Sequence, residues 1–198
     1  MIKNWVNKNR ILSPVQIIDL QLGIPQDYKQ KCIDEIYRLG DSQNRSTNIK
    51  GTMTKGRIWE QSKIFNPLIK QIMLSIKDIY PLSDKRFNYG IDDIWGATYK
   101  NGDYTVAHTH GNSYLSFVYY LKSNGKTPII FDECNFQMNP TDDLLIIFPS
   151  YIIHSVPPHE ENEDRICIAG NISLDLKSKN LRQNLITKYN NPSDEHYE

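Results

Sequence analysis

The spacing of apolar residues predicts two amphipathic helices in the first half of the chain. One helix is expected from Pro25 to Leu39, because its apolar positions recur every three or four residues. A second helix is expected from Asn66 as the N-cap, with Pro67 at the first helical position, and Pro81 ends it. Each helix has one apolar face, so we expect both to cover a sheet.

Alternating and β-branched runs predict the strands. Val15 to Leu22 is typical of a strand at the edge of a sheet. Asp41 to Thr54 is rich in Ser, Asn, Thr and Gly and is predicted to be a loop, either a solvated connector or a segment that contacts substrate or acts as a lid. The remaining strands are expected at residues 91–99, 105–110, 114–122, 127–133, 143–148, 151–156 and 165–174.

Two helices followed by many short strands favour a mainly β fold with flanking helices, a double-sheet jelly roll or barrel. A length of 198 residues suits a single domain. Within 1–198 we expect a strand and two covering helices in 1–90, the jelly-roll core in 91–174 and a polar tail in 175–198.

The composition excludes some classes of partner. The chain has 23 Lys and Arg residues and 23 Asp and Glu residues, so no net charge attracts nucleic acid or an anionic membrane. It contains neither an apolar stretch that could span a bilayer nor the apolar core of a signal peptide. Three widely spaced cysteines are typical of reduced thiols. We therefore expect a cytoplasmic protein.

Histidines in the second half of the chain suggest a metal site. If residues 105–110 form a strand, His108 and His110 point to the same face, because side chains alternate along a strand. His154 follows an apolar run typical of a buried strand and can supply a third nitrogen donor. Arg165 opens the next strand and brings a fixed positive charge that suits an anionic co-substrate.

These residues belong to a longer ordered pattern. It reads Tyr-x-x-Gly-x-Tyr-x-x-x-His-x-His at 99–110, Leu-Ser-Phe-Val-Tyr-Tyr-Leu at 115–121, Phe-Pro-Ser-x-x-x-His-x-Val-x-Pro at 148–158, and then Arg165. Over roughly residues 92–172 the chain resembles the prolyl-4-hydroxylase-type branch of the Fe(II)/2-oxoglutarate oxygenases, and more closely a group of small oxygenases in that superfamily. The superfamily usually has His-x-Asp where this chain has His108-Thr-His110.

The resemblance implies a double-stranded β-helix that uses Fe(II), O2 and 2-oxoglutarate as co-substrate, hydroxylating a substrate while 2-oxoglutarate is decarboxylated to succinate. It implies that the metal ligands are His108, His110 and His154. It also implies that co-substrate contacts come from Arg165, Tyr120, Tyr99 and Asn171, with Tyr119 facing the other way. Substrate contacts or support for the ligands are expected from Asn112, Tyr104 and Ser116.

Several alternatives stay open at the level of sequence. His110 is either a ligand or a neighbour of the metal, in which case Asp132 or Glu133 replaces the missing carboxylate. The same barrel with three histidines also fits a cupin-type enzyme that works without 2-oxoglutarate, or a non-catalytic binding module. The substrate, a small molecule or a peptide, and the oligomeric state are not indicated. His159 and His196 lie in polar sequence and are expected to be solvated.

Overall fold

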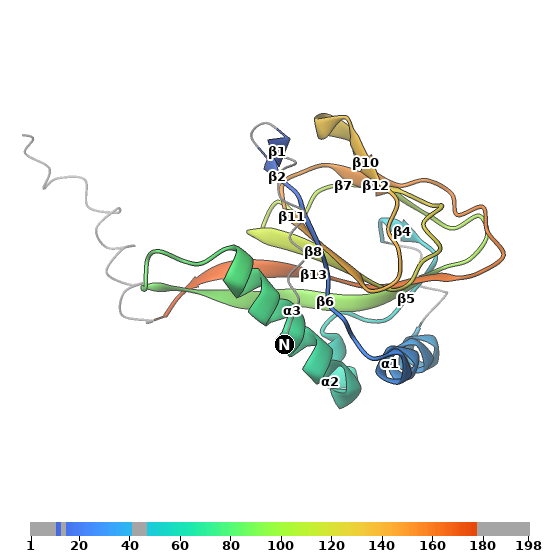
Figure 1. The fold of residues 1–198 in the computed structure, drawn as a ribbon, viewed down its shortest axis with the longest axis horizontal. Coiled ribbons are helices and arrows are strands. Elements are labelled where there is room, and N and C mark those ends of the chain that lie inside the picture. The colour runs from blue at the N-terminus through green and yellow to red at the C-terminus, as the bar shows by residue number, and fades with distance from the viewer. Residues whose placement is uncertain (1–10, 13–14, 41–46, 178–198) are drawn as a thin grey trace, which may run out of the picture.

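The fold consists of two main antiparallel sheets with helices on one side (Figure 1). The computed structural model describes residues 11–12, 15–40 and 47–177. The larger sheet has the order β3 (Ile18–Gln21), β11 (Leu144–Pro149), β8 (Leu115–Lys122), β13 (Arg165–Leu176), β6 (Phe87–Tyr99) and β5 (Thr52–Met53). The smaller sheet has the order β10 (Phe136–Met138), β9 (Ile129–Phe131), β12 (His154–Val156), β7 (Tyr104–His108) and β4 (Ile49–Lys50). A separate ribbon pairs β1 (Ile11–Leu12) with β2 (Val15–Gln16).

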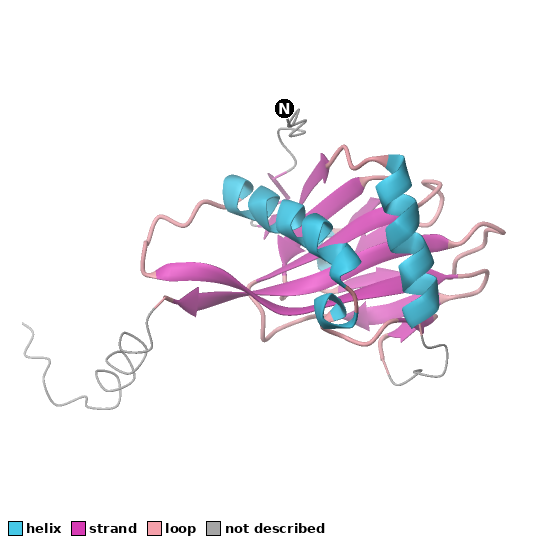
Figure 2. Cartoon of the chain, turned by 90° about the horizontal axis from the view of Figure 1, so that it is seen from below, coloured by secondary structure: helices cyan, strands magenta, loops and turns pink. Residues whose placement is uncertain are grey.

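The helices cover the outer face of the six-stranded sheet (Figure 2). The two long ones are α1 (Gln26–Leu39) and α3 (Asn66–Ile79), and the short elements α2 (Ile58–Gln61) and η1 (Lys63–Phe65) connect β5 to α3. The helix α1 buries Cys32, Ile33 and Ile36 against the sheet, as its apolar spacing predicts. In the described residues, no helix has the length and apolar character needed to cross a membrane.

Two apolar cores meet at the six-stranded sheet. One core lies between this sheet and the helices, and the other lies between the two sheets. Along β8, Tyr119 belongs to the first core and Tyr120 to the second, as alternation requires. The predicted jelly roll with covering helices is therefore confirmed, and a face of the sheet that carries chemistry is enclosed by a second sheet.

Several boundaries differ from the sequence-based expectation. The predicted loop at 41–54 contains β4 and β5, which pair with β7 and β6 and so depend on distant partners rather than on local sequence. The predicted strand at 127–133 ends at Phe131 and continues as η2 (Asp132–Cys134) and β10. Asn66 is not the N-cap of α3, because η1 runs directly into the helix and Phe65 occupies the cap position.

The ends of the chain also differ in part. Asp175 and Leu176, predicted as tail, extend β13, where they pair with Asn88 and Phe87. The rest of the predicted tail, 178–198, and the loop residues 41–46 lie outside the described residues.

Candidate metal centre and anion pocket

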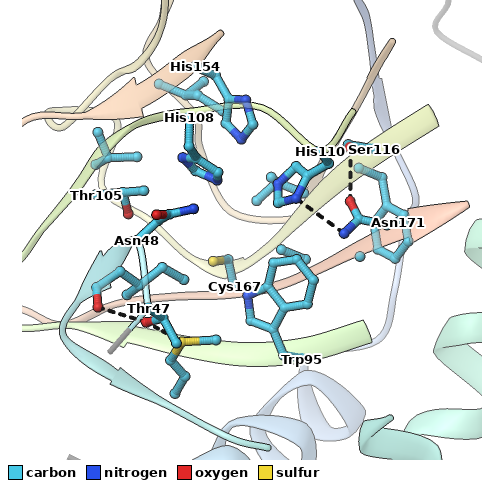
Figure 3. Close-up of a pocket in the computed structure, with 18 of the residues that line it drawn as sticks. Thr47, Asn48, Trp95, Thr105, His108, His110, Ser116, His154, Cys167 and Asn171 are labelled. Atoms are coloured by element: carbon cyan, nitrogen blue, oxygen red, sulfur yellow. Dashed lines mark hydrogen bonds between the residues drawn. The ribbon is translucent and has the colours of Figure 1, made fainter. Parts of the chain in front are cut away.

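A cavity of about 300 Å³ lies between the two sheets. The six-stranded sheet lines it with residues of β6, β8 and β13, and the five-stranded sheet with residues of β7, β9 and β12. Thr47, Asn48 and Ile49, around the start of β4, line it as well, so the predicted loop does reach the cavity. Figure 3 shows its polar side chains converging from both sheets.

Three histidines meet in this cavity. One potential ligand atom from each of His108, His110 and His154 lies within 4.8 Å of the others, so the three residues could hold a single metal ion. The ring centroids are 4.3 Å apart for His108 and His154, and 4.8 Å apart for His108 and His110. Figure 3 shows the rings pointing toward one another.

A β-bulge aims His108 into the cavity. In the β7–β12 ladder Thr105 pairs with Val156 and His108 pairs with His154, so three steps on β7 match two on β12. Thr105 and His108 both line the cavity, although strict alternation would place them on opposite faces. The strand ends at His108, so the expectation of a strand through residue 110 is wrong.

His110 is instead held by a turn after β7. Its backbone N–H donates to the Ser150 carbonyl over 2.8 Å, and its own carbonyl accepts from Ser113 N–H over 2.9 Å. The two histidines thus reach one point by a bulge and a turn, not by the period of a strand.

Backbone carbonyls fix the protonation of two rings. His108 Nδ1 lies 2.8 Å from the Val106 carbonyl oxygen, and His154 Nδ1 lies 3.0 Å from that of Ile152. A carbonyl only accepts, so each Nδ1 carries the proton and each Nε2 keeps a lone pair for a metal.

Burial also keeps the rings neutral. Desolvation, with a smaller effect of His108, lowers the pKa of His154 to about 3 and that of His110 to about 4. Desolvation lowers the pKa of His108 too. Neutral imidazole is the form that binds metals, so none of the three rings has to lose a positive charge before it binds at pH 7. Cys167 also lines the cavity, but burial raises its pKa to about 11 and it remains a thiol.

Arg165 supplies a buried positive charge to the same cavity. The residue is 2% exposed, and its Nη2 donates to the Tyr120 hydroxyl over 3.0 Å. Its guanidinium carbon lies 5.0 Å from the ring centroids of both Tyr99 and Tyr120. Within the described part of the chain, Arg165 Nε and Nη1 are buried and have no hydrogen-bond partner.

The unpartnered donors of Arg165 indicate an anion site. Leaving a buried cation without a counter-charge is costly, and a carboxylate is the natural acceptor for a guanidinium. The donors therefore fit a carboxylate, and the histidines lie toward the other end of the cavity, where His110 contacts Asn171, six residues from Arg165 along β13.

Most of the predicted site residues line the cavity. They are His108, His110, His154, Arg165, Tyr99, Tyr120, Asn171 and Ser116. Asn112 and Tyr104 are exposed and lie outside the lining, because Asn112 is in the turn after His110 and Tyr104 points outward from β7. Asp132 and Glu133 are exposed in η2 and are not part of the three-histidine group.

One histidine was misassigned from sequence. His159 is 1% exposed, not solvated, and its two ring nitrogens contact Thr127 Oγ1 and the Glu163 carbonyl, each at 2.7 Å. Polar local sequence predicted exposure, but these contacts satisfy the ring inside the fold. His196 lies outside the described residues.

Some lining residues were missed in the sequence. Trp95 and Asp93 on β6, and Cys167 on β13, line the cavity. Counting back from Tyr99 in steps of two gives Trp95 and Asp93, and counting forward from Arg165 gives Cys167. Period two along the predicted strands was therefore the signal that would have found them.

Comparison with known proteins places the fold. The family model of 2OG-Fe(II) oxygenases matches residues 130–171, a stretch that contains His154 and Arg165 but not the other two histidines. A search of curated protein sequences finds no significant match.

Among solved structures, the chain is similar to a viral collagen prolyl hydroxylase from Paramecium bursaria Chlorella virus-1 in complex with 2-oxoglutarate, with a TM-score of 0.62 and 13% identity over 82% of this chain and 98% of that one. A Pseudomonas putida prolyl-4-hydroxylase is similar with a TM-score of 0.58 and 17% identity over 82% of this chain and 95% of that one. The α-ketoglutarate-dependent epimerase SnoN from nogalamycin biosynthesis is similar with a TM-score of 0.64 and 8% identity over 81% of this chain and 78% of that one. The jelly-roll fold and the resemblance to 2-oxoglutarate/Fe(II) oxygenases are thus confirmed.

Proposed function

We propose that this chain is a non-haem Fe(II)- and 2-oxoglutarate-dependent dioxygenase that hydroxylates its substrate. The observation that carries the proposal is the pairing, in one cavity, of three neutral histidines with a buried arginine whose Nε and Nη1 have no hydrogen-bond partner among the described residues. A histidine cluster alone fits many metalloproteins. The added anion site selects a co-substrate that bears a carboxylate.

Arg165 and Tyr120 would hold the far carboxylate of 2-oxoglutarate. Arg165 Nε and Nη1 are available to it, and the Tyr120 hydroxyl already touches the guanidinium. The aromatic rings of Tyr99 and Tyr120 contact Arg165 and restrict its rotation, so the charge is held in place before the anion arrives. Tyr99 acts through its ring, because its hydroxyl is 2.7 Å from Thr105 Oγ1.

His108 and His154 would bind iron through Nε2, with His110 as the third ligand. Imidazole nitrogens suit Fe(II), and three protein ligands leave positions for co-substrate and O2. When bound, iron, 2-oxoglutarate and O2 supply the oxidation, in which substrate C–H becomes C–OH and 2-oxoglutarate becomes succinate and CO2. The chain positions the reactants and excludes bulk water from the enclosed end of the cavity.

The substrate would enter over β4 and β6. Trp95 Nε1 is a buried donor without a hydrogen-bond partner among the described residues, and Trp95 lies 5.9 Å from the His110 ring. An oxygen acceptor on a small molecule or a peptide would satisfy it. Hydroxylation itself needs its own test, since the structurally similar SnoN is an epimerase.

The direct test is reconstitution without oxygen. Protein free of chelator and affinity tag is loaded with Fe(II), and 2-oxoglutarate is added while the weak visible charge-transfer band is recorded. We expect a band in the wild type, followed by succinate release when O2 is admitted. Bound iron without a band at any 2-oxoglutarate concentration would favour a cupin-type enzyme. If the protein binds no metal, the non-catalytic binding module is the interpretation that remains.

A further inference from the structure

The three rings differ in how their second nitrogen is satisfied. His108 and His154 each place Nδ1 against a carbonyl oxygen. His110 places Nδ1 against the side-chain amide of Asn171, whose Nδ2 lies 3.3 Å away (Figure 3). A carbonyl enforces one tautomer, whereas an amide presents either a donor or an acceptor.

The Asn171 amide also contacts Ser116. In this structure the Ser116 hydroxyl donates to Asn171 Oδ1 over 2.9 Å, which leaves Nδ2 to donate to His110 Nδ1. The proton of the neutral His110 ring is then on Nε2, so Nε2 has no lone pair for a metal. The site in this state offers two ready ligands, not three.

Turning the amide reverses this arrangement without leaving an unpaired group. Oδ1 would then accept from His110 Nδ1–H, and Nδ2 would donate to Ser116 Oγ, since a hydroxyl both donates and accepts. His110 Nε2 would gain its lone pair. Ser116 and Asn171 are paired on the adjacent strands β8 and β13, so the amide can rotate while the backbone of both residues stays in place.

We propose that Asn171 is a positioning residue that sets the tautomer of His110, and that metal binding selects the turned amide and so recruits His110 as the third ligand. This inference rests on the proposed metal site and goes beyond it, because it assigns Asn171 to His110 and not to the co-substrate. Replacing a residue that hydrogen-bonds to a metal ligand commonly changes the metal affinity by 10- to 100-fold.

Two substitutions of Asn171 separate the two tautomers. In Asn171→Asp the carboxylate can only accept, which holds the proton on His110 Nδ1 and frees Nε2, so the Kd for Co(II) should fall on the order of tenfold. In Asn171→Leu neither tautomer is supported, and the Kd should rise on the order of tenfold. Metal titrations without 2-oxoglutarate measure both changes.

The same substitution in a His110→Ala background shows whether the effect passes through His110. We expect Asn171→Asp to change Co(II) affinity little there. An equal gain in both backgrounds would mean that the new carboxylate attracts or binds the metal by itself, which overturns the inference. Asn171→Asp with wild-type affinity would also overturn it.

Nitrogen-15 NMR of the histidine rings reads the tautomer directly. His110 should carry its proton on Nε2 in the metal-free wild type and on Nδ1 in the Zn(II)-loaded protein and in metal-free Asn171→Asp. A proton on Nδ1 in the metal-free wild type overturns the inference. A wild type that binds no metal overturns the proposed function as well. A metal affinity that does not change in the Asn171 variants overturns only the positioning role.

Discussion

The two sheets build the cavity in different ways. The six-stranded sheet contains β6 and β13, of 13 and 12 residues, which pair over almost their whole length. Most of the side chains that it turns into the cavity, Arg165 and Tyr120 among them, follow alternation, although β13 has register shifts between Ile166 and Cys167 and between Asn171 and Ile172. The strands of the five-stranded sheet have two to five residues, and its ladder is broken by the bulge before His108.

This difference separates the tasks of the two sheets. The long strands fix a buried charge among packed aromatic rings, where an anion site has to be rigid. The short strands position His108 and His154, and each ring is oriented by a carbonyl two residues before it in the chain. The metal end therefore depends on local geometry and the anion end on the sheet. A substitution should be able to disable one end while the other end still binds its ligand.

The largest effect is expected at the metal end. Replacing His154 or His108 by Ala removes an Nε2 ligand, and we expect the affinity for Fe(II) or Co(II) to fall by roughly 100-fold or more. His159→Gln is the matched control, because His159 is buried and hydrogen-bonded but is not part of the cavity lining. It should lower the melting temperature and keep the metal. Wild-type metal affinity in His154→Ala would refute the assignment.

The next effect is expected at the anion end. Arg165→Leu should raise the Kd for 2-oxoglutarate by roughly 100-fold, since it leaves the carboxylate buried without its counter-charge. The affinity for the metal should not change. Tyr120→Phe removes one hydroxyl contact and should cost about tenfold or less. If Arg165→Leu also lost the metal in titrations without 2-oxoglutarate, the two ends would not be independent.

The six-stranded half of the site could be predicted from the sequence. Apolar runs located β8, β11 and β13, and alternation placed Tyr120 and Tyr119 on opposite faces, where they lie. Arg165 was indicated by its position at the start of the next strand, together with the resemblance. The same two-residue alternation, counted along β6 and β13, would have identified Trp95 and Cys167.

The five-stranded half could not be predicted in this way. A bulge adds a residue to one strand in response to its partner, and β7 alone gives no sign of it. The strand β4 has only two residues and exists because β7 pairs with it. His159 appeared solvent-exposed because its neighbours are polar, yet Thr127, more than 30 positions away, satisfies its ring. Each of these features depends on contacts distant in sequence.

The rigidity of the six-stranded sheet can be tested at its contact with α1. A Cβ atom added to Gly96 on β6 would lie 2.7 Å from Ile36 Cγ1, so the helix or the strand would have to shift. We expect Gly96→Ala to lower the free energy of unfolding by about 1–3 kcal/mol. At Gly111 nothing lies within 4 Å of such an atom, so Gly111→Ala should cost far less. Urea unfolding compares the two, and equal stabilities would contradict close packing of α1 on the sheet.

The five-stranded sheet should instead be the acid-sensitive part of the metal-free protein. Burial lowers the pKa of His154 to about 3, against about 6.5 in an unfolded chain. Between these values the unfolded chain binds a proton that folded His154 does not, so stability falls as the pH decreases from 6.5. The slope attributable to His154 is at most about 1.4 kcal/mol per pH unit. Because carboxylates titrate lower, unfolding between pH 6.5 and 5 isolates the histidines, and His154→Gln should flatten the profile there. An unchanged slope would mean that folded His154 takes up its proton as readily as the unfolded chain.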